Sequence, residues 1–354
     1  MSPTTTIPVP DSVVLKPGSL ILITGVTGYI GAHLADQLLL RGYKVRGAVR
    51  KPAEWLLQIF DSKYGKGNFE TWFVADLTDE EALSKAMQGV SGVAHVASDV
   101  SFSPDPNVVI PIAVNLATTA LKAAAKASSV RRFVLTSSST AASVCVPNVP
   151  RTITASSWSD GFIEQARKPG PYTPDRGLST YGASKALAEQ AVLNWAKENT
   201  SRGLVVNTVL PDFNLGLPIS PENQGWPSSV HFAVALFNGD VQTGRMLPPQ
   251  CFIAVQDTAL LHVAALLHPD VKNERIFGFA EPKNANSILR TYKELYPNRK
   301  FAEEDPEEGE DLGVVEQKDR AEELLKWIAG KEWTRMKESC KEVGDYLIEH
   351  EKTG

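Results

Sequence analysis

The stretch "LILITGVTGYIGAHLADQLLLRG", residues 20–42, decides the fold. It opens with a short apolar run that ends in glycine, which predicts a buried strand over residues 20–25. A helical pattern begins at residue 29 and stops at Gly42. Three glycines, Gly25, Gly28 and Gly31, span the junction of the two elements. The sequence therefore predicts a strand, a tight glycine turn and a helix in direct succession.

The same alternation continues outward from this stretch. Further strands are expected over residues 43–50, 69–77, 92–98, 131–139 and 203–211, and a long helical pattern occupies residues 107–128. Strands that alternate with helices are typical of parallel βαβ units. We therefore predict an α/β fold with a doubly wound (Rossmann) parallel sheet and a smaller, mostly C-terminal lobe.

Composition limits the class of protein. The chain has 354 residues, 43% of them hydrophobic and 22% charged, with a formal net charge of -5, as in an ordinary globular protein. Basic residues do not cluster, which argues against a nucleic-acid partner. The three cysteines fit no metal spacing and indicate a reducing compartment. We see neither a signal peptide nor an apolar run of membrane-spanning length, so the expected location is cytoplasmic, without metal or membrane.

The glycine loop predicts a dinucleotide site. Glycines let the backbone approach a pyrophosphate, and the helix start offers free N–H groups and the positive end of the helix dipole. The spacing is GxxGxxG rather than the common GxGxxG, and a simple tight turn is the alternative. We expect cofactor contacts from the loop and the first helical turn, at Thr24, Gly25, Thr27, Gly28, Tyr29, Ile30 and Gly31.

The end of the second strand distinguishes the two nicotinamide dinucleotides. NAD enzymes place an acid there, and NADP enzymes place a basic residue that pairs with the 2′-phosphate. Here the strand ends in Arg50 and Lys51, which favours NADPH/NADP; a solvated basic pair is the alternative. Asp76, followed by Leu77, ends the third strand and is expected at the adenine edge, unless it caps the next helix.

A plain helical stretch, "STYGASKALAEQA" at residues 179–191, carries a phenol and an ammonium one turn apart. Tyr181 and Lys185 share a helix face, and the lysine charge is expected to lower the phenol pKa from its usual value near 10. Such a pair suits proton exchange with a hydroxyl or carbonyl oxygen. The similar spacing of Tyr296 and Lys300 is discarded because Pro297 interrupts the helix. The run "TSSST", residues 136–140, adds serines at a strand end, one of which could bond the substrate oxygen.

The chain divides into three expected parts. Residues 1–18 form a flexible N-terminal segment, 19–210 the NAD(P)-binding Rossmann domain, and 211–354 the substrate-binding lobe. Residues 250–268 are expected to return to the Rossmann sheet with a seventh strand. The acidic run 303–311 is expected to be a solvated loop. Amphipathic patterns over 320–330 and 336–350 predict helices that pack on the lobe.

Together, the motifs "TGVTGYIG", "VRGAVR", "ADL", "HVAS", "FVLTSSS", "YGASK" and "NTVLP" resemble an extended short-chain dehydrogenase/reductase. The resemblance is greatest to the fungal NADPH-dependent aldehyde and ketone (carbonyl) reductases, relatives of the dihydroflavonol and cinnamoyl-CoA reductases. It implies NADPH-dependent reduction of a small-molecule aldehyde or ketone by a monomer or homodimer.

The resemblance also implies roles for single residues. Tyr181 gives the proton, Lys185 holds the nicotinamide ribose, and Ser138 orients the carbonyl, with Ser137 or Ser139 as alternatives. Asn115 either anchors a proton-relay water or is a polar helix residue that faces outward. The remaining expected cofactor contacts are Val96, Ala97, Ser98, Pro211 and Phe213.

The sequence departs from the family pattern in two places. A second basic residue found in some relatives is Glu54 here, and the loop 98–106 lacks a common proline. The expected pocket walls, Phe102, Trp226 and Phe232, could instead be core residues. Two other functions were weighed. A nucleotide-sugar epimerase or dehydratase usually has an acid where Arg50 stands, and a non-catalytic dinucleotide-sensing regulator typically loses the tyrosine.

Overall fold

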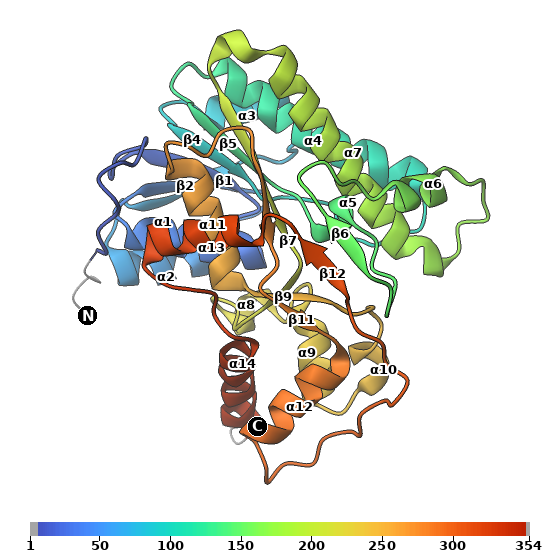
Figure 1. Cartoon of the computed structure of the whole chain (residues 1–354). Helices are drawn as coiled ribbons and strands as arrows, with labels where there is room; N and C mark the ends of the chain where they lie inside the picture. Colours follow the sequence, from blue (N-terminus) through green and yellow to red (C-terminus); the bar gives the residue numbers. More distant parts are fainter. Residues whose placement is uncertain (1–5, 352–354) are drawn as a thin grey trace.

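The computed structural model describes residues 6–351, which form a Rossmann-type layer structure with a smaller lobe beside it (Figure 1). Seven strands form the central sheet, in the order β10-β7-β5-β4-β1-β2-β3, and every neighbouring pair is parallel. The fold prediction is therefore confirmed. The strands are β1 (Leu20–Thr24), β2 (Lys44–Val49), β3 (Phe69–Phe73), β4 (Gly92–His95), β5 (Arg132–Thr136), β7 (Val205–Pro211) and β10 (Arg275–Gly278).

Helices cover both faces of this sheet, and each face has its own apolar cluster. One face carries α1 (Tyr29–Leu40), α2 (Glu54–Tyr64), α11 (Val255–Leu267) and α13 (Lys318–Ala329). The other carries α3 (Glu80–Ala86), α4 (Pro106–Lys126) and α7 (Gly177–Glu198).

Helix α4 is long and apolar enough, by length and composition alone, to cross a membrane. The expectation that no apolar run reaches that length is therefore wrong. However, α4 packs against α3 and α7 and contributes Ala117, Ala120 and Leu121 to the core under the sheet. Its apolar character is accounted for by this packing, as in the core helix of a Rossmann layer.

The smaller lobe is built around a three-stranded sheet, β11-β9-β8. Its strands are β8 (Phe213–Leu215), β9 (Gln250–Ala254) and β11 (Glu281–Lys283), and its helices are α8 (Pro221–Gln224), α9 (Val230–Phe237), α10 (Val241–Gly244), α12 (Ala285–Leu295) and α14 (Met336–Glu351). A pair of short parallel strands, β6 (Arg151–Ile153) and β12 (Gly313–Val315), joins the lobe to the segment that carries α5 (Ser139–Ala142) and α6 (Asp160–Arg167).

Three expectations about the chain organisation are wrong. Residues 250–254 pair with β8 and β11, so the seventh strand of the central sheet is β10; only the following helix, α11, returns to the Rossmann layer. Helix α13 packs on α11 rather than on the lobe, whereas α14 packs on α12 and α9 as expected. The described part of the N-terminal segment is docked, with Val13 and Leu15 buried and Tyr43 donating to the Leu15 carbonyl.

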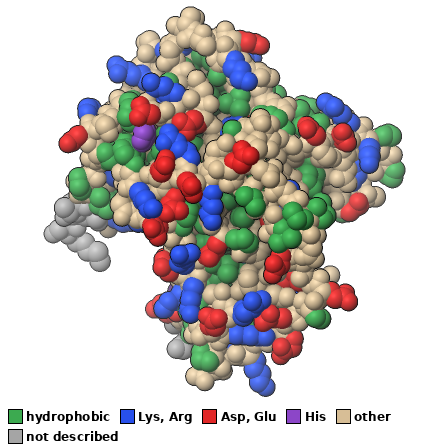
Figure 2. Space-filling model, in the orientation of Figure 1, with side chains coloured by type: hydrophobic (Ala, Val, Ile, Leu, Met, Phe, Trp, Pro, Cys, Tyr) green, Lys and Arg blue, Asp and Glu red, His purple; other side chains and the backbone are tan. Residues whose placement is uncertain are grey.

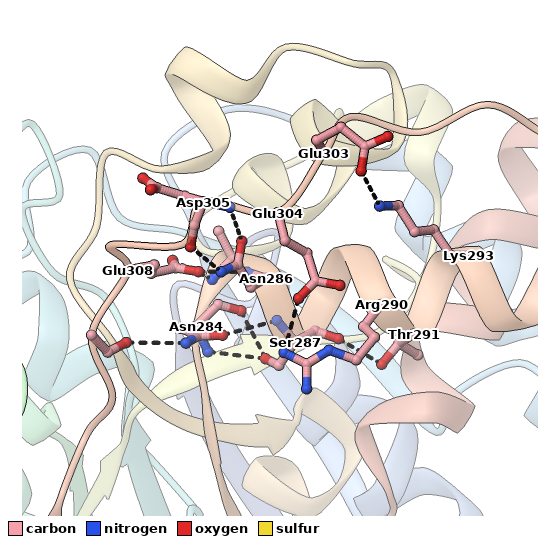
Figure 3. Close-up of polar contacts among 12 residues, drawn as sticks. Asn284, Asn286, Ser287, Arg290, Thr291, Lys293, Glu303, Glu304, Asp305 and Glu308 are labelled. Carbon is pink, nitrogen blue, oxygen red and sulfur yellow. Dashed lines mark hydrogen bonds and ion pairs between the residues drawn. The ribbon is translucent and has the colours of Figure 1, made fainter.

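The acidic run 303–311 is a largely exposed loop, as expected, and it is also fastened to α12 (Figure 3). The Glu308 carboxylate accepts the N–H groups of Ala285 and Asn286 at 2.8 and 2.7 Å, where the helix dipole favours negative charge. Glu303 and Glu304 pair with Lys293 and Arg290 on the same helix. On the face drawn in Figure 2, acidic and basic side chains are interspersed.

Candidate active site

The glycine loop packs so closely against neighbouring backbone that side chains would not fit at Gly25 and Gly31. Gly25 has φ +70°, and a Cβ there would lie 2.8 Å from the Ala97 nitrogen; a Cβ at Gly31 would lie 2.2 Å from the Gly25 oxygen. Thr27 and Gly28 are exposed at the start of α1, which has no acid in its first turn and no side-chain cap. The free N–H groups of this turn therefore suit the pyrophosphate of a dinucleotide.

Thr24 connects the glycine loop to the end of β4. Its hydroxyl lies 3.0 Å from His95 Nδ1 and accepts the Ala97 N–H at 3.3 Å. Ala97 and Ser98 line a small cavity with Lys185. Burial, with a contribution from Lys185, lowers the pKa of His95 to about 3, so this imidazole is neutral. The expected loop of residues 96–98 thus lies between the glycine loop and the Tyr–Lys helix.

The basic end of β2 is exposed. Within residues 6–351, no carboxylate forms an ion pair with Arg50 or Lys51, so both cations are available to a phosphate. Asp76 is exposed as well and accepts two hydrogen bonds from Thr78, which lower its pKa. Asp79, not Asp76, caps α3.

Tyr29 faces away from the expected cofactor. Its ring lies in the lobe core, and its hydroxyl donates to the Gly216 carbonyl at 2.7 Å. A cofactor contact at Tyr29 would therefore come from its backbone; Ile30 likewise packs on the lobe core. Gln224 was not expected from the sequence to contact this loop, yet its Nε2 donates to the carbonyls of Thr27 and Gly28, both at 3.1 Å.

Tyr181 and Lys185 lie as the spacing predicts, one turn apart on α7. The Lys185 Nζ lies 5.8 Å from the centre of the tyrosine ring and donates to the Thr136 carbonyl at 3.2 Å. Burial raises the pKa of Tyr181 to about 12, and a hydrogen bond with Ser138 opposes this only in part. The expected lowering of the phenol pKa is therefore wrong for this structure, because burial has the largest effect and the nearby Asp212 adds to the rise. At neutral pH the phenol holds its proton and can donate it.

The three serines after β5 separate into different environments. Ser137 donates to Glu189 and Ser139 donates to Asp212, each at 2.7 Å. Ser138 hydrogen-bonds with Tyr181 and also accepts from the Thr140 hydroxyl at 2.9 Å. Ser138 and Ser139 both line the cavity beside the phenol, and of the three serines it is Ser138 that interacts with Tyr181.

Glu189 is a site residue that the sequence reasoning missed. It is fully buried on α7, four residues after Lys185, and opposes the burial that lowers the pKa of Lys185 to about 8. Its carboxylate accepts from Ser137, from Thr208 at 2.6 Å, and from Arg275 at 2.9 and 3.2 Å. An acid on the same face as Tyr181 and Lys185, in "YGASKALAE", was the available signal.

Asn115 does not join this site. It is exposed on α4, and its side-chain oxygen accepts from Thr119 at 3.1 Å. The neighbouring α4 residues Ala113, Leu116 and Ala117, rather than Asn115, line the small cavity beside Lys185. The structure agrees with the outward-facing alternative for Asn115.

A cavity of about 280 Å³ opens beside the phenol. Its lining includes Ser138 and Tyr181 and the three expected aromatic walls: Phe102, Trp226 and Phe232. The rings of Phe102 and Tyr181 lie 4.8 Å apart, centre to centre. Phe213 also lines the cavity, and Pro211 is buried just before it. A larger cavity of about 670 Å³ lies at the β10 edge of the sheet and contains neither Tyr181 nor Ser138.

The fold and this site define an extended Rossmann-type short-chain dehydrogenase/reductase. The model of the "NAD dependent epimerase/dehydratase family" matches residues 21–211, more than half of the chain, so the chain belongs to that family and the resemblance is confirmed. Aldehyde reductase 2 of Sporidiobolus salmonicolor is 36% identical over 337 residues, 94% of this chain and 97% of the relative. Ketoreductase adrE of Penicillium roqueforti is also 36% identical, over 92% and 96% of the two chains.

A solved structure repeats the fold over nearly the whole chain. The complex of Gre2 from Candida albicans with NADPH superimposes with a TM-score of 0.80, over 94% of this chain and 99% of that chain, at 22% sequence identity.

Proposed function

We propose that this protein reduces an aldehyde or ketone to the alcohol with NADPH. The observation that carries the proposal is the juxtaposition of Ser138 and Tyr181 at the wall of an aromatic cavity, with Lys185 one helical turn from Tyr181. The names of the relatives, an aldehyde reductase and a ketoreductase, and the NADPH complex of Gre2 support it.

The dinucleotide would lie on the glycine loop, with its 2′-phosphate toward Arg50 and its nicotinamide ribose toward Lys185. When bound, it would supply the hydride for the carbonyl carbon. Tyr181, protonated at neutral pH, gives its proton to the carbonyl oxygen, while Ser138 donates a hydrogen bond to the same oxygen. Lys185 stabilises the phenolate that remains.

The basic end of β2 favours this proposal over the epimerase alternative, because an acid would be expected there. The retained Tyr181 favours it over a non-catalytic sensor. A small-molecule carbonyl substrate belongs to the proposal, and a cytoplasmic location and a monomeric or homodimeric state stay predictions. The direct test is NADPH oxidation by the purified protein against aldehydes, ketones and ketoesters; no oxidation with any of them would refute the proposal.

The cofactor preference has its own test. Arg50→Asp removes the expected phosphate partner and adds repulsion, which should cost about 2–3 kcal/mol in NADPH binding, or roughly 30- to 150-fold. The measurement is the ratio of kcat/KM with NADPH to that with NADH. Lys44→Asp, an exposed reversal of charge at the opposite end of β2, is the matched control. An equal ratio in Arg50→Asp and wild type would contradict the assignment.

A further inference from the structure

Asp212 stands where two cavities meet. It follows β7 directly and lines both the 280 Å³ cavity with Tyr181 and an adjoining cavity of about 100 Å³. The smaller cavity also has polar walls, which include Ser143, Arg151 and Asp311. A carboxylate at this junction meets any substrate group that extends from the carbonyl toward the smaller cavity.

The Asp212 carboxylate is hydrogen-bonded but not neutralised. Its oxygens accept from the Ser139 hydroxyl at 2.7 Å, the Gln250 amide at 3.1 Å and the Cys251 N–H at 2.7 Å. All three donors are uncharged, and within the described chain no lysine, arginine or histidine forms an ion pair with Asp212. Asp212 is only partly buried, so it is open to the cavity, and a carboxylate removed from water without an ion-pair partner favours a bound cation or donor.

The nearby cations are engaged elsewhere. Arg151 pairs with Asp311, with a shortest contact of 2.7 Å. The Lys283 ammonium is buried and stands 3.8 Å from the centre of the Phe213 ring, where it influences Asp212 without forming an ion pair. Lys283 therefore balances the negative charge of Asp212 only in part, from beyond ion-pair distance.

Gln250 adds a second acceptor. It lines both cavities, and its amide nitrogen is turned toward Asp212, which can only accept. The side-chain oxygen of Gln250 therefore faces groups other than Asp212. It is buried, and no group in the described chain donates a hydrogen bond to it. One wall of the site thus offers a carboxylate and an amide oxygen, and both call for a donor.

We propose that Asp212 selects carbonyl substrates that carry a hydrogen-bond donor, above all a protonated amine, and that it disfavours substrates that carry a carboxylate. The inference rests on the proposed reductase function and specifies its substrate class. Charge-assisted hydrogen bonds are about twice as strong as neutral ones, whereas two carboxylates at one site repel.

A metal ion is the other cation to consider. Ligand atoms of Asp212, Cys251 and Asp311 lie within 4.8 Å of one another. Arg151 already occupies Asp311, and burial raises the pKa of the Cys251 thiol, which stays protonated and is a poor ligand. We therefore assign the wall to a substrate group, and an activity that responds to a chelator would contradict that assignment.

The test uses four ketones with one scaffold and a single varied substituent: methyl, hydroxymethyl, aminomethyl or carboxylate. Well above pH 6, the aminomethyl ketone should have a kcat/KM roughly 10- to 100-fold above the methyl ketone, and the carboxylate ketone should be the poorest. Asp212→Asn keeps the size of the side chain and removes its charge. In this variant, the kcat/KM values of the aminomethyl and carboxylate ketones should approach that of the methyl ketone.

The pH dependence provides a test that needs no variant. Burial raises the pKa of Asp212 to about 6, against hydrogen bonds from Cys251 and Ser139 and the attraction of Lys283, while Asp311 adds to the rise. The carboxylate is therefore charged above pH 6 and neutral below it. The ratio of aminomethyl to methyl kcat/KM should fall as pH drops through this value, whereas effects on Tyr181 or the cofactor cancel in the ratio.

Asp240→Asn is the matched control, because Asp240 is an exposed N-cap of α10 outside both cavities. It should keep the wild-type preferences. Turnover of the methyl ketone without discrimination, or discrimination that survives in Asp212→Asn and at low pH, would overturn this inference and leave the reductase function standing. Failure to oxidise NADPH with any of the four ketones, or with simple aldehydes, would instead overturn the proposed function itself.

Discussion

A buried carboxylate, Glu189, and a partly buried one, Asp212, flank the Tyr181–Lys185 pair, and they differ in how their charge is balanced. Glu189, on the sheet side, accepts two hydrogen bonds from Arg275 and two from hydroxyl groups. Asp212, on the cavity side, accepts three hydrogen bonds and no ion pair among residues 6–351. Of the serines on either side of Ser138, Ser137 donates a hydrogen bond to Glu189 and Ser139 donates one to Asp212.

This difference implies different roles: Glu189 supports the structure, whereas Asp212 is available to recognise a ligand. On the sheet side, Arg275 is the cation that balances the charge of Glu189. The contacts of this carboxylate connect α7 to β7, to β10 and to the residue after β5. On the cavity side, hydrogen bonds hold the carboxylate in place but leave its charge for a ligand. A buried acid is therefore informative about function when the structure gives it no counterion.

The largest effect is expected from Tyr181→Phe, which leaves both carboxylates and their hydrogen bonds intact. Turnover should fall by about 100- to 10,000-fold, because the proton donor is lost, while NADPH binding measured by fluorescence stays near wild type. Tyr296→Phe is the matched control, since that hydroxyl bonds Asp345 at the surface. Near-normal turnover in Tyr181→Phe would falsify the proposed mechanism.

Glu189→Gln should show the next largest effect, on stability. It leaves the guanidinium of Arg275 buried without its partner, at an expected cost of about 3–5 kcal/mol in the free energy of unfolding. Asp212→Asn breaks no ion pair and should cost only about 1 kcal/mol. Urea unfolding of both variants and of Glu189→Gln/Arg275→Met, which should recover part of the loss, measures the contrast. Equal losses in the free energy of unfolding for Glu189→Gln and Asp212→Asn would contradict the proposed difference between the two carboxylates.

The smallest of the three effects concerns the serines between the acids. Ser138→Ala should lower turnover roughly 100-fold by removing a donor to the developing oxyanion. Ser137→Ala and Ser139→Ala remove donors to Glu189 and Asp212, and each should cost about 1 kcal/mol of stability with a smaller loss of turnover. A larger loss of turnover in either neighbour would show that the carbonyl is bound by a different serine.

The parts of the fold that depend on local rules could be predicted from the sequence. Six strands of the central sheet, the glycine turn and the helix with Tyr181 all follow from hydrophobic period and turn chemistry. The strand at 250–254 was also predicted, but in the wrong sheet, because its apolar pattern does not specify which strands it pairs with. The docking of residues 6–18 and of α13 depends in the same way on surfaces that are distant in sequence.

The site shows the same division. The exposed position of Arg50 and Lys51 at the end of β2 could be predicted from the strand pattern, and their contact with a phosphate stays a prediction. Gln250 was not, because it reaches Asp212 through strand β9 of the smaller sheet, 38 residues further along the chain. The pKa of Tyr181 was predicted in the wrong direction, because helical spacing reveals the lysine but not the burial of the ring.

Helix α8 and Trp226, which follows it, contact two stretches that lie far from them in the chain, the glycine loop and helix α14. Gln224 bonds the glycine loop, Glu222 accepts from the Tyr346 hydroxyl of α14 at 2.8 Å, and the Trp226 ring meets the Tyr346 ring edge-on at 5.6 Å. For protein engineers, this makes the loop, the α8 segment and the last helix a single unit of exchange. A chimaera that replaces only residues 212–254 with those of a relative would lose the contacts of this segment with the glycine loop and with α14. Residues 25–31 and 336–351 should therefore be replaced together with it.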